Sequence, residues 1–237
     1  MWRPPRGRLR ASYRLQLVTD WAAKRDWAER EHERRLAAPA GGGAREDFRL
    51  AGIAGASWAA GLAARMHGDD EAAASLLRRA AGEYAASWKA APPGSWGRPI
   101  AMLRCRLLAG DVAGTRNDAD EALAAGAEAA AGPIAGYCAA LALLVLGRDE
   151  DAQPVAERIA REGLEPASVA HALAALAAGD PRRYDDARRA VLRSFEERDA
   201  FLEDLHVADT VLVLDALARE RGVGVEPLAT PLLPPQS

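Results

Sequence analysis

Cysteine, aromatic residues and unbalanced charge are all scarce in this chain. Its 237 residues include two cysteines, Cys105 and Cys138, without a CxxC pair, so we expect buried free thiols and neither a disulfide nor a zinc site. Aromatic residues make up 5% of the sequence, which disfavours β-sheets. The net charge is −3 with both signs interspersed, so the composition argues against a nucleic-acid or membrane partner.

Long hydrophobic runs are also missing. The longest, from Pro133 to Gly147, is shorter than the roughly 18 to 20 residues that a membrane span requires. The basic start, from Met1 to Arg10, is not followed by an uninterrupted apolar stretch, so it does not have the pattern of a secretory signal. We therefore expect a cytoplasmic protein.

The motifs that identify common enzymes are absent from the sequence. It has no GxxxxGK[ST] phosphate loop, no HExxH zinc motif, no GxSxG nucleophile motif and no Cys and His set with metal-ligand spacing. We expect no cofactor and no metal, and we classify the chain as a non-enzyme.

The sequence is rich in alanine and leucine, in stretches that end at a glycine followed by a charged residue. This happens four times, at Gly68-Asp69, Gly110-Asp111, Gly147-Arg148 and Gly179-Asp180. The glycines are 42, 37 and 32 residues apart, close to the roughly 34-residue period of one class of helical repeats. Glycine can supply the left-handed residue that ends one helix, and an aspartate can cap the next. The expected caps are Asp69, Asp111, Asp149 and Asp180. The pattern predicts an all-α fold, a right-handed array of antiparallel helix hairpins with about ten helices.

The segment from about Glu46 to Lys89 resembles a tetratricopeptide unit. The residues that carry this resemblance stand at the small and turn positions of the unit: Gly61, Gly68, Ala73 and Ala80. The chain departs from the family at Ala60 and Ala64, where a large aromatic residue or leucine is usual. The resemblance implies a tetratricopeptide-like α-solenoid and, by analogy with the family, a role in binding peptides or proteins.

Stretches rich in proline and glycine divide the chain into a repeat domain and flanking segments. The expected organisation is a disordered basic leader (1–11), an N-terminal helix (12–38), a flexible linker (39–45), a helical-repeat domain (46–225) and a Pro-rich tail (226–237). The linker would allow the first helix to be an arm outside the array. The last helix, about 208–221, is expected to close the array.

Trp88, Trp96 and Arg98 are candidate partner-binding residues. Trp96 and Arg98 lie in a predicted loop, Pro92 to Pro99, and a large aromatic side chain in a loop often anchors a contact. The alternative for Trp96 is that it folds back over the end of the hairpin. Trp88 could equally fill the core of the first hairpin.

Acidic residues gather in the C-terminal third. Glu203, Asp204 and Asp209 are further candidates for partner binding. With His206 among them, they also allow an alternative function, an enzyme with a polar pocket near His206 and Asp209. The plainer interpretation is a solvated face with a helix cap. Asp215 interrupts an apolar stretch, so it either faces solvent or needs an arginine or several hydrogen-bond donors.

The last third of the chain resembles the end of immunity protein family 49, helical proteins of bacterial polymorphic toxin systems. The similar features are the Gly179-Asp180 turn, a helix from Tyr184 to Arg198, an apolar helix from Asp209 to Gly222 and a tail that ends in Leu233-Pro234. Pro231-Leu232 stand where the family has an acidic residue and a tyrosine. The resemblance implies a non-enzymatic antidote that binds and blocks a cognate toxin.

Together these patterns favour a non-enzymatic helical-repeat protein whose partner is another protein. Within this function, an immunity protein is the first hypothesis. The alternatives are the enzyme with a polar pocket near His206 and Asp209 and, second, a regulatory adaptor. The sequence leaves the oligomeric state open.

Overall fold

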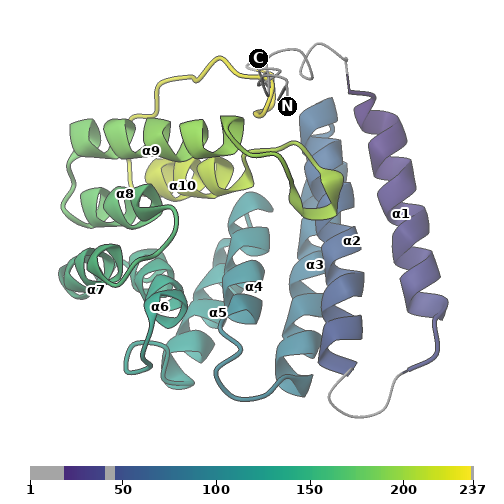
Figure 1. Ribbon diagram of the computed structural model, residues 1–237, viewed down its shortest axis with the longest axis horizontal. Coiled ribbons are helices and arrows are strands. Elements are labelled where there is room, and N and C mark those ends of the chain that lie inside the picture. The colour runs from purple at the N-terminus through teal and green to yellow at the C-terminus, as the bar shows by residue number, and fades with distance from the viewer. Residues whose placement is uncertain (1–18, 41–45, 236–237) are drawn as a thin grey trace, which may run out of the picture.

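The computed structural model describes residues 19–40 and 46–235, and over these residues the chain is helical (Figure 1). They form ten α-helices and the short 3-10 helix η2, and no β-strand, which confirms the all-α prediction. The helices are α1 (Trp21–Ala37), α2 (Glu46–His67), α3 (Asp70–Ala90), α4 (Gly97–Leu108), α5 (Val112–Ala124), α6 (Pro133–Val145), α7 (Asp149–Arg161), α8 (Ala167–Ala177), α9 (Pro181–Glu196), η2 (Leu202–Asp204) and α10 (Asp209–Glu220).

The predicted glycine and aspartate positions do set most helix ends. The four repeat glycines have positive φ angles, at Gly68, Gly110, Gly147 and Gly179. Three of the four expected aspartates accept hydrogen bonds from the first turn of a helix: Asp69, Asp111 and Asp180. The fourth expectation is wrong, because Asp149 is the first residue inside α7 and Arg148 is its N-cap. A carboxylate at that position still favours the helix through the helix dipole.

Each helix from α1 to α8 packs against the next one along the chain. The centre of the core is α6, which is buried nearly all round from Cys138 to Leu144, as its apolar sequence predicts.

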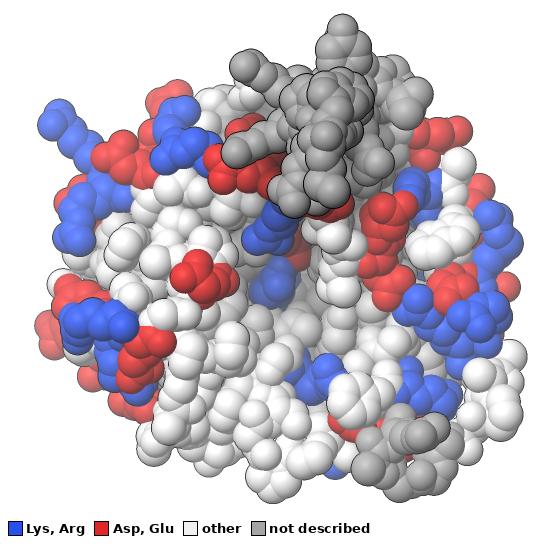
Figure 2. Space-filling model, in the orientation of Figure 1, with Lys and Arg blue, Asp and Glu red and all other residues white. Residues whose placement is uncertain are grey.

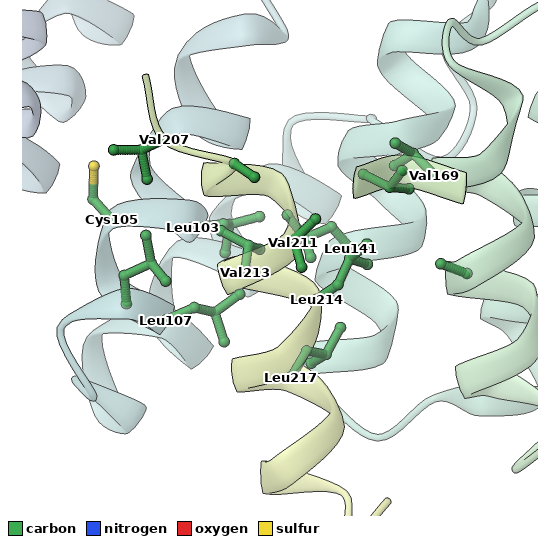
Figure 3. Close-up of a cluster of buried hydrophobic side chains, with 14 of the residues drawn as sticks. Leu103, Cys105, Leu107, Leu141, Val169, Val207, Val211, Val213, Leu214 and Leu217 are labelled. Atoms are coloured by element: carbon green, nitrogen blue, oxygen red, sulfur yellow. The ribbon is translucent and has the colours of Figure 1, made fainter. Parts of the chain in front are cut away.

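The last helix does not simply extend the series. Helix α10 packs against α9 and α8 and also returns to α4, whose sequence lies about a hundred residues earlier. Figure 3 shows Val211, Leu214 and Leu217 of α10 between Leu107 of α4 and Leu141 of α6, and all of these side chains are buried. The last helix is therefore not only the end of a series of neighbouring helices, because it also packs against α4 from the middle of the chain.

The N-terminal helix also differs from its prediction. It begins at Trp21, and the Asp20 carboxylate caps it by accepting a hydrogen bond from the Ala23 amide at 2.9 Å. Residues 19 and 20 are not helical. Helix α1 packs along α2 instead of lying apart as an arm. The predicted segments that fall outside the described residues are 1–11, 12–18 and 41–45.

The C-terminal segment is part of the packed fold rather than a free tail. Leu228, Leu232 and Leu233 are buried, and the Ala208 amide donates to the Leu232 carbonyl at 2.9 Å. The predicted tail (226–237) therefore packs onto the helices over its described residues.

The buried carboxylate of Asp215 has the partners that burial demands. It accepts from the Tyr184 hydroxyl at 2.9 Å and from Arg188 Nη1 at 3.1 and 3.2 Å. The Arg188 side chain is 1% exposed. This network joins α10 to α9. It shows that Asp215 is buried beside an arginine and does not face solvent, the two alternatives that the sequence left open.

Candidate functional site

The chain between α9 and α10, residues 197–208, crosses from α9 toward α2 and α1 before it returns to α10 (Figure 1). We call this segment the strap. At its turning point Glu203 and Asp204 have φ angles of 52° and 51°, a left-handed conformation that is uncommon for residues with a side chain. Such a conformation costs on the order of 1 kcal/mol or more per residue and persists only where surrounding contacts hold it.

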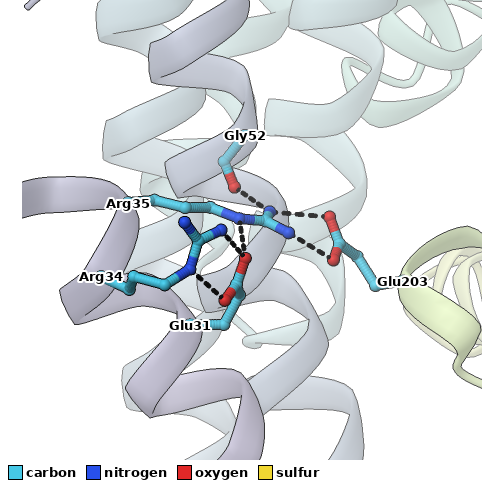
Figure 4. Close-up of polar contacts among 5 residues, drawn as sticks. All are labelled: Glu31, Arg34, Arg35, Gly52 and Glu203. Carbon is cyan, nitrogen blue, oxygen red and sulfur yellow. Dashed lines mark hydrogen bonds and ion pairs between the residues drawn. The ribbon is translucent and has the colours of Figure 1, made fainter. Parts of the chain in front are cut away.

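The contact that holds Glu203 is a two-pronged ion pair with Arg35 of α1 (Figure 4). Arg35 Nη1 and Nη2 donate to the two Glu203 oxygens at 2.8 and 2.9 Å, and Nη1 also donates to the Gly52 carbonyl at 2.6 Å. Glu31 accepts from Arg35 Nε at 2.8 Å and from Arg34. Hydrogen bonds from Arg34 and then Arg35 lower the pKa of Glu31 from 4.5 to about 2. The strap is thus anchored to α1 and α2 at one arginine.

A second ion pair holds Asp204. Lys24 Nζ lies 3.2 Å from Asp204 Oδ2 and donates to the Asp204 carbonyl at 3.1 Å. Because the Asp204 side chain is 80% exposed, this pair contributes little stability by itself. The pair provides a second contact between the strap and α1.

The elements joined by this second pair, the strap and α1, each carry one exposed apolar side chain. Leu202, next to Glu203 in the strap, is 65% exposed, and Trp27 of α1 is 40% exposed. The Lys24 Nζ atom lies 5.8 Å from the centre of the Trp27 ring, within reach of a cation–π interaction. We call Lys24, Trp27, Leu202 and Asp204 the strap face.

The far end of the strap is fixed by Asp209. Its carboxylate forms an ion pair with Arg104 of α4 and accepts from the Thr210 amide at 2.8 Å. Asp209 is 7% exposed. It therefore joins the start of α10 to α4. The expectation that an aspartate caps this helix is wrong, because Ala208 is the N-cap of α10 and Asp209 is its first residue.

Burial raises the pKa of the Tyr137 hydroxyl on α6 and that of the Tyr84 hydroxyl on α3. The charge of Arg104 on α4 acts against burial in both cases, because it favours the ionised form of each tyrosine. Figure 2 shows a hollow near the middle of this face, beside the strap and over α4, with positively charged side chains inside it.

The neighbouring thiol cannot serve as a nucleophile at ordinary pH. Burial raises the pKa of Cys105 to about 12, and Cys138 is shifted in the same way. Both cysteines are free and buried, as the sequence predicts.

The two tryptophans predicted to bind a partner both have packing contacts within the chain. Trp88 and Trp96 are partly buried and pack against a small core cluster that contains Ile100 and Ala127. The alternative for Trp96, that it folds back on the helices, describes this packing. Arg98 lies 3.6 Å from Asp47 of α2 and is thereby engaged within the chain.

The acidic candidates are likewise engaged within the chain. Glu203 pairs with Arg35, Asp204 with Lys24 and Asp209 with Arg104. His206 stacks on Phe201, with 4.6 Å between the ring centres. Over the described residues there is no group of three His, Cys, Asp or Glu side chains that could hold a metal ion.

Arg35, Lys24, Arg104 and the two tyrosines were missed by the sequence interpretation. Their contacts join segments that are far apart: Arg35 and Glu203 are 168 residues apart, and Arg104 and Asp209 are 105 residues apart. Residues this far apart have no spacing in the sequence from which their pairing could be predicted.

Two pockets flank α10. One, of about 410 Å³, is lined by Leu212, Ala216 and Arg219 of α10 with residues of α2, α3 and α4. The other, of about 440 Å³, is lined on α10 by Leu217 and Glu220 and on the opposite side by α5 and α6. Both are open and mostly apolar, so neither concentrates reactive groups.

No family model, curated protein or solved structure matches this chain. None of the helices in the described part of the chain has the length and apolar character needed to cross a membrane.

Proposed function

We propose that this chain is a non-enzymatic protein-binding module, built as a tetratricopeptide-like, right-handed array of antiparallel helix hairpins. The succession of neighbouring helix contacts from α1 to α8 and the glycine turns between several of them support this architecture. We assign the protein-binding function to the strap face, because its apolar side chains are exposed and held by ion pairs.

The single observation that carries the proposal is the exposed Leu202 at the tip of a constrained strap. A leucine that is 65% exposed, followed by two left-handed acidic residues, gains nothing for folding. Backbone strain of this kind is typical of functional sites, where it fixes a side chain in advance of binding. The ion pairs from Arg35 and Lys24 supply the contacts that hold it.

The composition around Leu202 suits a protein partner. Trp27 provides a large apolar surface, and Lys24 and Asp204 provide a polar rim. Interfaces commonly place one or two aromatic or aliphatic anchors inside such a rim, and these anchors carry most of the binding energy.

The interior side of the array is a poorer candidate than the strap face. In tetratricopeptide-like arrays the concave side is the usual binding surface. In the proposed array this side would be occupied by α10, whose Val211, Leu214 and Leu217 are buried. A peptide on that side would have to displace a buried helix, at the cost of its apolar contacts.

Among binding roles, the resemblance of the last third to immunity protein family 49 favours a toxin antidote over an adaptor. The strap lies within that third, so a toxin-binding surface there is consistent with the resemblance. A blocked toxin would contact Leu202 and Trp27 directly.

Affinity capture with a matched control tests this proposal. Tagged wild type is compared with Leu202→Ser and with Ile134→Ser, because Ile134 is 51% exposed on a different helix, α6. A protein retained by wild type and by Ile134→Ser is expected to be reduced roughly thirtyfold by Leu202→Ser, the equivalent of one interface anchor.

The captured protein is then purified and its Kd is measured against Trp27→Ala. Retention of every captured protein by Leu202→Ser, or equal loss in Ile134→Ser, would contradict the assignment of the interface to the strap face. Circular dichroism of each variant confirms that the helices are intact.

A further inference from the structure

Helix α1 is attached to the rest of the protein largely through polar contacts. Only Ala28 and His32 of its 17 residues are buried, and Trp21 is partly buried against the core. Helix α3, in contrast, buries alanine, leucine and tyrosine side chains along its length. Because most of the stability of a helix in a protein comes from packing of its apolar face, α1 is held less firmly than the helices behind it.

Four side-chain pairs join α1 to other elements. Arg25 Nη1 lies 3.2 Å from Asp69 Oδ2 at the start of α3, and His32 Nε2 lies 2.7 Å from Glu83 Oε1 on α3. The other two are the ion pairs that hold the strap. Half of these pairs therefore attach α1 to the strap and half attach it to α3.

The strap depends on α1 in turn. Glu203 and Asp204, the two residues with left-handed backbone, have their side-chain partners in the described part of the chain on α1, at Arg35 and Lys24. A left-handed residue with a side chain persists only where surrounding contacts hold it. Departure of α1 would remove these contacts from both residues at once.

Arg35 joins α1, α2 and the strap at one guanidinium (Figure 4). It donates to the Gly52 carbonyl of α2 and to both oxygens of Glu203. A Cβ atom on Gly55 of α2 would lie 3.2 Å from Glu203 Oε1, so the glycine allows the strap carboxylate to approach α2 closely. Helix α1 cannot leave α2 without breaking this attachment of the strap.

The strap face takes its apolar residues from both elements. Trp27 lies on α1 and Leu202 lies in the strap. A partner that contacts both residues therefore requires α1 and the strap to be docked at the same time.

We propose that α1 and the strap open together as one cooperative unit while the other α-helices stay folded, and that a partner binds the strap face only when this unit is closed. Because a helix of this length is only marginally stable in water by itself, α1 loses its helical structure on opening. The control of partner binding rests on the proposed function, whereas the joint opening does not.

Hydrogen exchange of single backbone amides, measured by NMR on the full chain, tests the joint opening. The strap is followed at the Leu205 amide, which donates to the Leu202 carbonyl at 3.1 Å. We expect this amide and those in the middle of α1 to exchange at least about a hundredfold faster than those of α6, after correction for intrinsic rates. A rise in NaCl from about 50 to about 500 mM should speed both a few-fold, because exposed ion pairs are screened by salt.

Two neighbouring arginines of α1 form a matched pair of variants. Both pair with the same glutamate of α1, whereas Arg35 also donates to Gly52 and Glu203. Arg35→Gln should speed exchange in α1 and at Leu205 together, about tenfold or more, and leave α6 unchanged. Arg34→Gln should leave the Leu205 amide unchanged. Exchange in α1 as slow as in α6, or an effect of Arg35→Gln on α1 without one at Leu205, would overturn the joint opening.

The captured partner tests the control of binding. At about ten times its Kd, a partner that binds only the closed form should slow the exchange of α1 and of Leu205 about tenfold, and by the same factor. A partner that leaves either rate unchanged would overturn the control, even where the joint opening is observed. Capture of no partner would contradict the proposed function and with it the control of binding, while the exchange rates of the free chain would still decide the joint opening.

Discussion

Replacing Asp215 by alanine should be among the most damaging single changes in this chain. The substitution removes a carboxylate that is buried between α9 and α10 and leaves the Arg188 guanidinium, whose side chain is 1% exposed, without its main counter-charge. Removing one partner of a buried ion pair typically costs about 3 to 5 kcal/mol, because the remaining charge is stranded in a medium that solvates it poorly.

The geometry places the cost toward the lower end of that range. Asp215 accepts three hydrogen bonds, one from Tyr184 and two from Arg188, and all three are lost. Arg188 nevertheless keeps hydrogen bonds to Asp185 at 2.6 Å and to the Glu226 carbonyl at 2.7 Å. We therefore expect a loss of about 3 kcal/mol for Asp215→Ala. Asp215→Asn retains an acceptor and should lose about 1 to 2 kcal/mol.

Urea unfolding followed by circular dichroism measures this difference as a change in midpoint at constant slope. Asp186→Ala is the matched control, since Asp186 is an exposed residue of α9 and its replacement should change stability by less than about 0.5 kcal/mol. A second test replaces both charges, with Arg188→Met and Asp215→Leu. The double variant should be more stable than the sum of the single effects predicts. A loss below about 1 kcal/mol for Asp215→Ala, or one no larger than that of the control, would refute the reasoning.

Four further substitutions have expected outcomes. Gly61→Ala should destabilise by about 1 to 3 kcal/mol, because its new Cβ would lie 2.7 Å from Leu77 Cγ, whereas Gly82→Ala has open space and should stabilise by up to about 1 kcal/mol in the same urea assay. Asp180→Ala should cost about 1 kcal/mol, since its carboxylate accepts two amide hydrogen bonds at the start of α9; an unchanged midpoint would contradict this role. Because the pKa of Glu31 is lowered from 4.5 to about 2, its stabilising effect is present above pH 4.5 and is lost as the pH falls toward 2. Thermal melts of Glu31→Gln should therefore depend less on pH across that window than those of wild type.

Helix positions could be predicted from the sequence because their signals are local. A glycine such as Gly110 and an aspartate such as Asp111 act on the backbone within a few residues, so the turn can be identified without knowing what packs around it. The misplaced cap at Asp149 shows the limit of such signals. Arg148 lies between glycine and aspartate there, and a shift of one residue decides which of them begins the helix.

The candidate site could not be predicted in the same way. Whether Asp215 faces solvent or an arginine depends on where α9 lies, and whether Leu202 is exposed depends on where the strap crosses α1. The ion pair of Arg35 with Glu203 joins residues that have no relation in the sequence pattern. Glu203 and Asp209 were selected for their charge, and the structure shows that both charges serve first to hold the chain in place.

The strap is the place where the described part of this chain departs most from the local rules that the rest of it follows. Elsewhere glycine occupies the left-handed turns that end the helices, whereas the strap places Glu203 and Asp204 in that conformation. The strap is joined to α1 by the ion pairs of Arg35 with Glu203 and of Lys24 with Asp204, which connect segments far apart in the sequence. Departures of this kind reduce stability and are retained where they serve another purpose, so functional sites are the expected place for them. Both left-handed acidic residues lie in the strap, residues 197–208. A partner protein that contacts Leu202 would therefore bind the segment in which the backbone departs from the local rules.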